Sequence, residues 1–308
     1  MMDKFRRILL VSAAAAGICA AMAGHHAQAQ DWRAQFRELE FAVIPAENAE
    51  GVVGRYGPML AHLSKELRVP VKLRIANDYA AVIEGQRSGQ IHVALYGPAS
   101  FARALKTGVK VEAFAQTVNE DGARGYYSVF YVRADSPYRT IQDLKGKNLG
   151  LVDPNSTSGY NVPLYTLNKL SIDPTSFFGK TLMTGSHENA VMALQQGTVD
   201  VAANAWTDEN VSYLRRMATK KMVKAEDFRI ILKSDMIVNS PIAYRSDFPA
   251  EMKTAIATAF LEAPSKAPEA FHRITDGRDR PWAPVGNDAY QPIIELINFV
   301  DSLKKKSN

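Results

Sequence analysis

Short runs of apolar and β-branched residues alternate along the chain with longer segments in which apolar residues recur every three or four positions. The short runs predict buried strands, and the longer spacing predicts amphipathic helices. Helical spacing is clear at Met59, Leu63 and Leu67, and again at Phe101 and Leu105. The predicted strands cover residues 39–45, 71–75, 91–95, 111–117, 126–132, 148–152, 181–183, 199–203 and 230–233.

This alternation predicts an α/β fold with mainly parallel sheets that are flanked by helices. Two segments divide it into lobes. Asp135-Ser136-Pro137 follows the strand that ends at residue 132, and Asn239-Ser240-Pro241 precedes a short strand over 241–244. Each is typical of a place where the chain crosses between lobes. After the second crossing we expect only helices, at residues 251–263, 268–275 and 289–306.

The two crossings predict two lobes with a ligand cleft between them. The first lobe is discontinuous and consists of residues 31–131 and 242–308, and residues 133–240 form an inserted second lobe. No repeat of about 20–50 residues is evident after residue 30, which excludes solenoids and propellers.

The first 29 residues have the pattern of a cleavable secretory signal peptide. A basic start (Lys4, Arg6, Arg7) precedes an uncharged apolar run over residues 8–23, and Ala27-Gln28-Ala29 has the small-x-small spacing of a cleavage site. The alternative is a permanent anchor helix, but the run is shorter than the ~20 residues that span a bilayer. We therefore predict an exported mature chain that is not inserted in a membrane.

Composition narrows the possible functions. The 308 residues are 46% hydrophobic and 22% charged, which is ordinary for a globular protein. The net charge of +5 falls to +3 without residues 1–29, which is too little over two domains to indicate a nucleic-acid partner. The single cysteine, Cys19, excludes an internal disulfide, and the histidines lack metal-ligand spacing. We predict no cofactor and no metal.

One strand-to-helix junction is rich in uncharged hydrogen-bond donors. Asp153-Pro154-Asn155 is followed by Ser156, Thr157, Ser158 and Gly159, and a helix begins there. Hydroxyl groups and free backbone N–H groups at a helix start bind oxyanions. The simpler alternative is a helix cap, but a cap needs one hydroxyl rather than three in succession.

Three more side chains lie at similar junctions. His187 follows Thr184-Gly185-Ser186, Tyr96 ends a strand, and Tyr56 stands just ahead of a helix that begins near Pro58. Taken singly, each side chain is as compatible with packing as with ligand binding. The junctions at 96–100, 153–160 and 184–189 contain no lysine or arginine, and Arg55 is the only basic residue near them in the sequence. A bound anion would therefore be held mainly by neutral dipoles.

Together these stretches resemble the periplasmic phosphate, phosphite and phosphonate-binding proteins of ABC importers, the PhnD type. The resemblance extends from about residue 41 to near residue 300. The matching stretches are Asp78-Tyr79-Ala80, Leu95-Tyr96-Gly97-Pro98, Gly125-Tyr126-Tyr127-Ser128-Val129, Asp153-Pro154-Asn155-Ser156-Thr157-Ser158-Gly159 and Gly185-Ser186-His187-Glu188.

The resemblance implies a two-lobed type II periplasmic binding protein that is a monomer and not an enzyme. It would capture a small phosphorus oxyanion and deliver it to a membrane permease that a separate ATPase drives. By the same resemblance, the ligand is held at the Ser156–Gly159 turn and His187, and Tyr96 and Tyr56 close from the other lobe.

Two positions depart from the relatives that bind aminoalkylphosphonates, which place carboxylates around the ligand's ammonium group. Ser240 stands at one of these positions and cannot pair with a charge. The other falls in the stretch Ala205 to Glu209, where Asp208 and Glu209 are both candidates and Trp206 is a candidate cleft wall. The organic end of the ligand is thus expected to differ from a primary amine or to be absent.

Two other functions compete with this interpretation. The chain could be a type II binding protein for another small oxyanion or an organic ligand. It could also be a secreted serine hydrolase that uses Ser156 or Ser158 with His187 and Asp153, but no G-x-S-x-G motif surrounds these serines.

Overall fold

The computed structural model describes residues 31–278 and 280–307, with side chains as far as residue 303. The predicted signal peptide, including Cys19, lies outside the described residues. The chain divides into two units, residues 1–35 and 36–308. The described part of the first unit contains the short helix α2 (Trp32–Gln35), and the elements below belong to the second unit.

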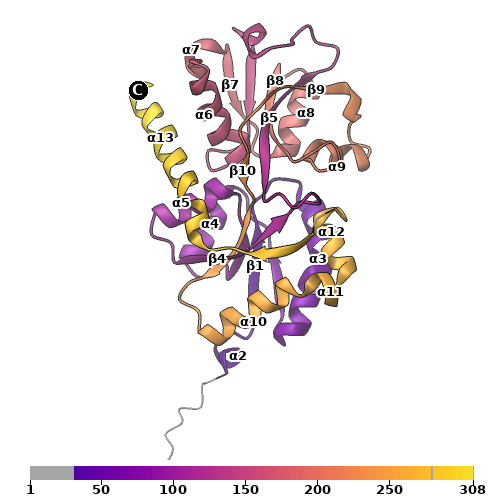
Figure 1. Ribbon diagram of the computed structural model, residues 1–308, viewed down its shortest axis with the longest axis vertical. Coiled ribbons are helices and arrows are strands. Elements are labelled where there is room, and N and C mark those ends of the chain that lie inside the picture. The colour runs from indigo at the N-terminus through magenta and orange to yellow at the C-terminus, as the bar shows by residue number, and fades with distance from the viewer. Residues whose placement is uncertain (1–30, 279, 308) are drawn as a thin grey trace, which may run out of the picture. The chain divides into compact units, whose positions relative to one another are not determined.

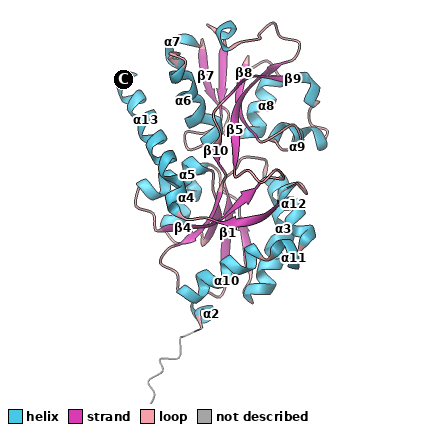
Figure 2. Cartoon of the chain, viewed as in Figure 1, coloured by secondary structure: helices cyan, strands magenta, loops and turns pink. Residues whose placement is uncertain are grey.

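The second unit contains two β-sheets with helices around each, which we call lobe 1 and lobe 2 (Figures 1 and 2). The lobe 1 sheet has the strand order β12-β4-β11-β3-β1-β2. Strand β1 pairs in parallel with β2 and β3, whereas the contacts β3–β11, β11–β4 and β4–β12 are antiparallel. Its strands are β1 (Leu39–Val43), β2 (Val71–Arg74), β3 (Val93–Leu95), β4 (Val111–Val118), β11 (Pro241–Arg245) and β12 (Arg280–Pro284).

The lobe 2 sheet has the order β10-β5-β8-β6-β7, with β9 also paired to β5. The pairs β6–β7 and β6–β8 are parallel, and β5 is antiparallel to its three neighbours. Both sheets are therefore mixed rather than mainly parallel. The strands are β5 (Gly125–Arg133), β6 (Asn148–Leu151), β7 (Lys180–Met183), β8 (Val201–Trp206), β9 (Phe228–Lys233) and β10 (Ile237–Val238).

The first change of sheet occurs earlier in the chain than the sequence pattern indicated. Strand β5 pairs with β8 and β9, so the chain has already left the lobe 1 sheet at residues 119–124 rather than near residue 132. Asp135-Ser136-Pro137 instead forms a turn between β5 and η1. The second change of sheet lies between β10 and β11, at Asn239 and Ser240.

The expectation that only helices follow the second crossing is wrong, because β12 forms an edge strand against β4. Its sequence, Arg-Pro-Trp-Ala-Pro, contains two prolines that obscure the strand signal. Proline lacks the N–H that an interior strand must donate, but an edge strand tolerates it. The lobe 1 helices are α3 (Ala49–Leu67), α4 (Tyr79–Arg87), α5 (Pro98–Lys106), α10 (Ala250–Leu261), α11 (Ala263–Lys266), α12 (Pro268–Thr275) and the 3-10 turn η4 (Asn287–Tyr290).

Helix α3 begins nine residues before the predicted start near Pro58, because the Asn48 side chain caps it by accepting a hydrogen bond from the Gly51 N–H. The predicted apolar face of Met59, Leu63 and Leu67 is buried. The helical elements of lobe 2 are η1 (Ile141–Leu144), η2 (Thr157–Asn161), α6 (Val162–Lys169), α7 (Pro174–Phe177), α8 (His187–Gln195), α9 (Tyr213–Thr219) and η3 (Ala225–Asp227).

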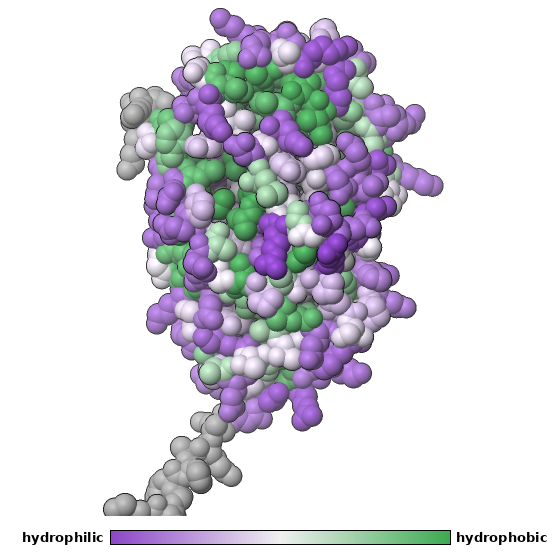
Figure 3. All heavy atoms as spheres, viewed as in Figure 1, coloured by the Kyte–Doolittle hydropathy of each residue, from purple (hydrophilic) through white to green (hydrophobic). Residues whose placement is uncertain are grey.

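The C-terminal helix α13 (Gln291–Ser307) contacts both lobes, because it packs on α5 of lobe 1 and on α6 of lobe 2 (Figure 1). A small apolar cluster joins Ala102 of α5, Val162 of α6 and Ile297 of α13. On the face that Figure 3 shows, hydrophobic side chains gather over the lobe 2 sheet, and hydrophilic side chains cover most of the rest. None of the described helices is both long and apolar enough to cross a membrane.

Candidate ligand-binding cleft

A cavity of about 170 Å³ lies between the two lobes. A single water molecule needs only ~10–15 Å³ by this kind of measure, so the cavity has room for more than a bare oxyanion. Lobe 1 contributes side chains from α3 and from the start of α4, and lobe 2 contributes η2, α8, α9 and the end of β8. Among the described residues, no group of three or more His, Cys, Asp or Glu is arranged to hold a metal ion.

The turn that begins η2 presents hydroxyl and amide groups to this cavity. Ser156, Thr157 and Ser158 all line it and are at most 2% exposed. The Ser156 hydroxyl caps η2 by accepting from the Gly159 N–H at 3.0 Å. The N–H groups of Thr157 and Ser158 have no hydrogen-bond partner among the described residues, as expected for the first residues of a helix. This turn therefore combines a cap at Ser156 with free donors at the next two residues.

Thr157 also joins the two lobes. Its Oγ1 accepts a hydrogen bond of 2.8 Å from the N–H of Ala99 in α5, and both residues are buried. Since the oxygen accepts from Ala99, the hydroxyl proton of Thr157 remains available to an oxygen atom in the cavity. Gly97 permits this approach, because a Cβ at that position would lie 3.2 Å from the Thr157 Oγ1.

The buried Tyr79 and the half-buried Tyr126 add hydroxyl donors that sequence reasoning did not assign to the site. The Tyr79 hydroxyl lies next to the Ser156 side chain but has no well-formed hydrogen bond among the described residues. Tyr126 lines the cavity beside Thr157 and Ser158. Burial raises the pKa of Tyr126 to about 12, although hydrogen bonding to these two residues acts in the opposite direction. Both phenols are therefore protonated donors at neutral pH.

The orientation of the His187 ring is fixed by Asn204. The Asn204 Nδ2 donates to the backbone oxygen of His187 at 2.9 Å, and its Oδ1 accepts from the N–H of Ala205 at 3.0 Å. This oxygen lies 3.0 Å from the Nδ1 of His187, so Nδ1 carries the proton. Tyr213 stacks on the ring at a centroid distance of 4.6 Å.

The His187 ring is electrically neutral at physiological pH. Burial lowers its pKa to about 3, Asn204 partly opposes this shift, and the charge of Arg216 adds to it. In the neutral ring with a proton on Nδ1, Nε2 is a hydrogen-bond acceptor. His187 lines the cavity, and its Nε2 has no partner among the described residues. The ring therefore offers an acceptor, rather than a donor, to whatever the cavity holds.

The structure brings most of the predicted site residues to one cavity. In addition to the three hydroxyl residues and His187, the lining contains Tyr56, Trp206 and Ser240. Tyr56 lies within α3, and Trp206 ends β8 with its ring 5.9 Å from that of Tyr127.

Three predicted site residues do not line the cavity. Tyr96 is fully buried in lobe 1 against Phe101, and its hydroxyl has no partner among the described residues. Gly159 lies against Val152, where an added Cβ would approach to 2.4 Å, so its place in the motif reflects close packing. The Asp208 carboxylate accepts from the N–H groups of Asn210 and Val211 and closes its own turn.

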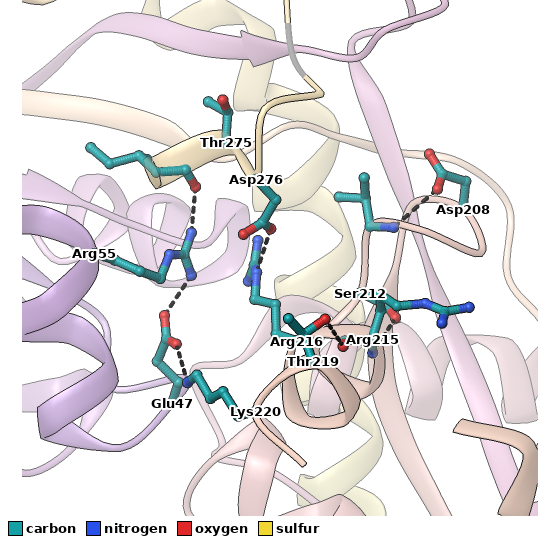
Figure 4. A network of polar contacts seen from close by, with 12 residues as sticks. Glu47, Arg55, Asp208, Ser212, Arg215, Arg216, Thr219, Lys220, Thr275 and Asp276 are labelled. Carbon is teal, nitrogen blue, oxygen red and sulfur yellow. Dashed lines mark hydrogen bonds and ion pairs between the residues drawn. The ribbon is translucent and has the colours of Figure 1, made fainter. Parts of the chain in front are cut away.

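Charged side chains at the edge of the cavity form a network that links the lobes (Figure 4). Arg55 of lobe 1 donates to Glu47 at 2.5 Å and to the backbone oxygen of Ile274 at 2.5 Å. Lys220 of lobe 2 lies 3.3 Å from Glu47 and 3.2 Å from Glu188.

A second ion pair connects Arg216 of α9 to Asp276, which follows α12, at 2.7 Å (Figure 4). Arg216 lines the cavity together with Arg55, so Arg55 is not the only basic residue there. Arg216 was not predicted because it lies inside a helix rather than at a strand-to-helix junction. The helical spacing of Ser212, Tyr213 and Arg216 gives no signal of its own.

The chain matches the family described as "ABC transporter, phosphonate, periplasmic substrate-binding protein" over residues 41–290. The phosphonates-binding periplasmic protein of Escherichia coli is 34% identical over 294 residues, which cover 92% of this chain and 81% of that protein. The phosphate-import protein PhnD of Mycolicibacterium smegmatis is 28% identical over 286 residues, which cover 87% of each chain.

A solved structure has the same fold. The binding protein component of an ABC phosphonate transporter from Pseudomonas aeruginosa superimposes with a TM-score of 0.79 at 30% identity, covering 88% of this chain and 89% of that one. The fold is that of a two-lobed type II periplasmic binding protein, as the sequence predicted. The family match, the relatives and the cleft between two mixed sheets lead to one conclusion: this chain belongs to the family of periplasmic substrate-binding proteins of phosphonate ABC transporters.

Proposed function

We propose that this protein binds a small phosphorus oxyanion, a phosphonate or phosphite, in the cleft and delivers it to the permease of an ABC importer. The observation that carries the proposal is the convergence of uncharged donors on one buried cavity. Ser158, Thr157, Tyr79 and Tyr126 contribute hydroxyl groups, and the η2 turn contributes two free N–H groups. Neutral dipoles at a helix start stabilise an anion without a counter-charge.

The acceptor at His187 favours an oxyanion that still carries a proton. A singly protonated phosphonate has one P–OH group, which can donate to the Nε2 of His187 while its other oxygens accept from the hydroxyls. A sulfate or sulfonate has no such proton at neutral pH and would direct an oxygen at the Nε2 lone pair. In this proposal, His187 and its positioning residue Asn204 separate phosphorus oxyanions from sulfur oxyanions.

The ligand is proposed to stabilise the closed arrangement of the lobes. Ala99 donates to Thr157, the N–H of His187 donates to the backbone oxygen of Ala46 at 3.0 Å, and both of these bonds join the lobes. An oxyanion on the η2 turn would add contacts to tyrosines of both lobes. Since these contacts exist only when the lobes are closed, binding shifts the population towards closure.

A hydrolase is disfavoured by the same geometry. In a serine hydrolase, the histidine Nε2 receives the nucleophile's proton while an acid orients Nδ1. Here an amide, Asn204, occupies the position of the acid, and the Ser156 hydroxyl is already engaged with Gly159. We therefore propose that the protein binds its ligand without converting it, acts as a monomer in the periplasm, and depends on a separate permease and ATPase for transport.

Thermal-shift and calorimetric measurements against phosphate, phosphite, methylphosphonate and sulfate test the proposal. We expect binding of a phosphonate or phosphite, no response to sulfate, and no consumption of the ligand on prolonged incubation. The substitution Ser158→Ala should weaken binding by about tenfold or more, because it removes a donor to a charged acceptor. Its matched control is Ser302→Ala on the exposed face of α13, which should leave binding unchanged. Failure of every phosphorus oxyanion to bind would reject the proposal and leave another type II ligand as the alternative.

A further inference from the structure

The charged edge of the cleft contains two guanidinium groups that the proposed oxyanion site does not use. Arg55 and Arg216 both line the cavity, and their side chains are 14% and 19% exposed. The hydroxyl groups of the η2 turn are more deeply buried, with residues 156–158 at most 2% exposed. The cavity therefore has an uncharged, buried part and a charged part that is more accessible.

Each guanidinium is held in place but retains free donors. Arg216 donates through Nε to Asp276, and its two Nη atoms have no hydrogen-bond partner among the described residues. Arg55 uses both Nη atoms on Glu47 and Ile274, and its Nε is buried without a partner in the described part of the chain (Figure 4). Such anchored guanidinium groups match the geometry of a carboxylate or a second phosphorus group.

The carboxylates at this edge are already paired. Glu47 accepts from Arg55 and Lys220, and Glu188 accepts from Lys220 and from both the N–H and the side chain of Asn48. Asp276 is paired with Arg216. Glu47 is the one acidic residue in the described lining of the cavity, which also contains two arginines. An ammonium group on the ligand would find no unpaired carboxylate there, and its burial beside two guanidinium groups is costly.

We propose that Arg216, supported by Arg55, forms a second anion-binding subsite, so that the ligand is a phosphonate whose organic group ends in a carboxylate or another anionic acceptor. This inference rests on the proposed function, because it assigns the phosphorus group to the η2 turn. The cavity volume of about 170 Å³ leaves room for such a group beyond the oxyanion. The aminoalkylphosphonates are excluded by the same arrangement.

Three ligands of matched length test the inference by calorimetry. 3-Phosphonopropionate carries a carboxylate, 2-aminoethylphosphonate carries an ammonium, and propylphosphonate carries neither. We expect the affinity for 3-phosphonopropionate to be at least about tenfold higher than the affinity for either of the other two ligands. Equal affinities for the three ligands, or a preference for the amine, would overturn the inference. In that case, binding of methylphosphonate would still support the proposed function. If no phosphonate bound but phosphite did, the inference alone would be rejected, and if no phosphorus oxyanion bound, both would be rejected.

Variants separate the subsite from the interlobe ion pair. Arg216→Gln should weaken binding of 3-phosphonopropionate by about tenfold or more and change methylphosphonate binding by less than about threefold. The matched control Arg215→Gln alters an exposed neighbour on the same helix and should affect neither ligand. Asp276→Asn breaks the ion pair but keeps the guanidinium, so the preference for the carboxylate should persist. An equal loss for both ligands in Arg216→Gln, or loss of the preference in Asp276→Asn, would show that Arg216 acts only through lobe closure and would refute the subsite.

Discussion

Replacement of Thr157 by valine tests the central contact between the lobes. Valine has nearly the shape of threonine but lacks the hydroxyl group. In the closed cleft this removes a donor to the charged ligand, worth ~1.5–3 kcal/mol, and leaves the buried N–H of Ala99 without its 2.8 Å acceptor, which costs a further ~1–3 kcal/mol. Both penalties fall on the closed, ligand-bound state. Their sum of ~2.5–6 kcal/mol corresponds to a loss of affinity of about 10²- to 10⁴-fold.

Isothermal titration of methylphosphonate into Thr157→Val and into the wild-type protein measures this loss directly. Thr157→Ser retains the hydroxyl and serves as the matched control, with an affinity expected within about tenfold of wild type. A thermal scan of each variant without ligand checks that the fold is intact. If Thr157→Val bound methylphosphonate within about threefold of wild type, the hydroxyl could not contact the ligand and the assignment of the oxyanion to the η2 turn would fail.

Three further predictions follow from particular groups. Because burial lowers the pKa of His187 to about 3, its neutral ring accepts a hydrogen bond from the P–OH group of the ligand at neutral pH. Affinity for methylphosphonate should therefore fall about tenfold per pH unit above the ligand's second pKa; an affinity that rises with pH by calorimetry would contradict this. Tyr96→Phe removes a buried hydroxyl without a partner in the described residues and should leave the affinity for methylphosphonate unchanged. Tyr79→Phe should weaken this affinity by about tenfold. A loss of affinity in Tyr96→Phe but not in Tyr79→Phe would show that Tyr96, and not Tyr79, contacts the ligand. Partial burial raises the pKa of Asp301, but hydrogen bonds from Arg103 and Lys106 lower it to about 2, so its stabilisation is present at neutral pH and is lost as the pH falls through that value. Asp301→Asn should therefore lower the melting temperature at pH 7 and converge with wild type near pH 2, unlike the exposed control Asp135→Asn.

The sequence predicted the elements whose signal is local. The ten predicted strands, including the short one over 241–244, and the apolar face of α3 correspond to elements of the structure, because β-branched runs and helical spacing both reflect burial of a nearby face. Strand β12 was missed because its two prolines are typical of a loop rather than of a strand. The crossing near residue 132 was misplaced because β5 pairs with β8, whose residues are 71 to 79 positions further along the chain.

The lining of the cavity was predicted in part for the same reason. The η2 turn is a continuous motif, so its residues lie together in any fold that contains it. The sequence pattern assigned Tyr96 to the site because it ends a strand, but in the structure Tyr96 packs against Phe101 and Tyr79 lines the cavity. Such packing depends on the tertiary fold and has no local sequence signal. Arg216 and Asp276 are 60 positions apart in the chain, so no local sequence pattern indicates that they pair.

The separation of neutral and charged groups in the cleft has a consequence for release of the ligand. If a guanidinium held the phosphorus group, departure of the ligand would leave a buried charge without a partner, at a cost of several kcal/mol. Hydroxyl and N–H donors leave no such charge and are readily hydrated when the lobes part. Arg55 keeps Glu47, a residue of the same lobe, as its partner when the lobes part, whereas the pair between Arg216 and Asp276 joins the lobes and separates on opening. A protein that must both bind an anion tightly and release it can therefore open at moderate cost, since the groups proposed to hold the phosphorus oxyanion carry no charge of their own.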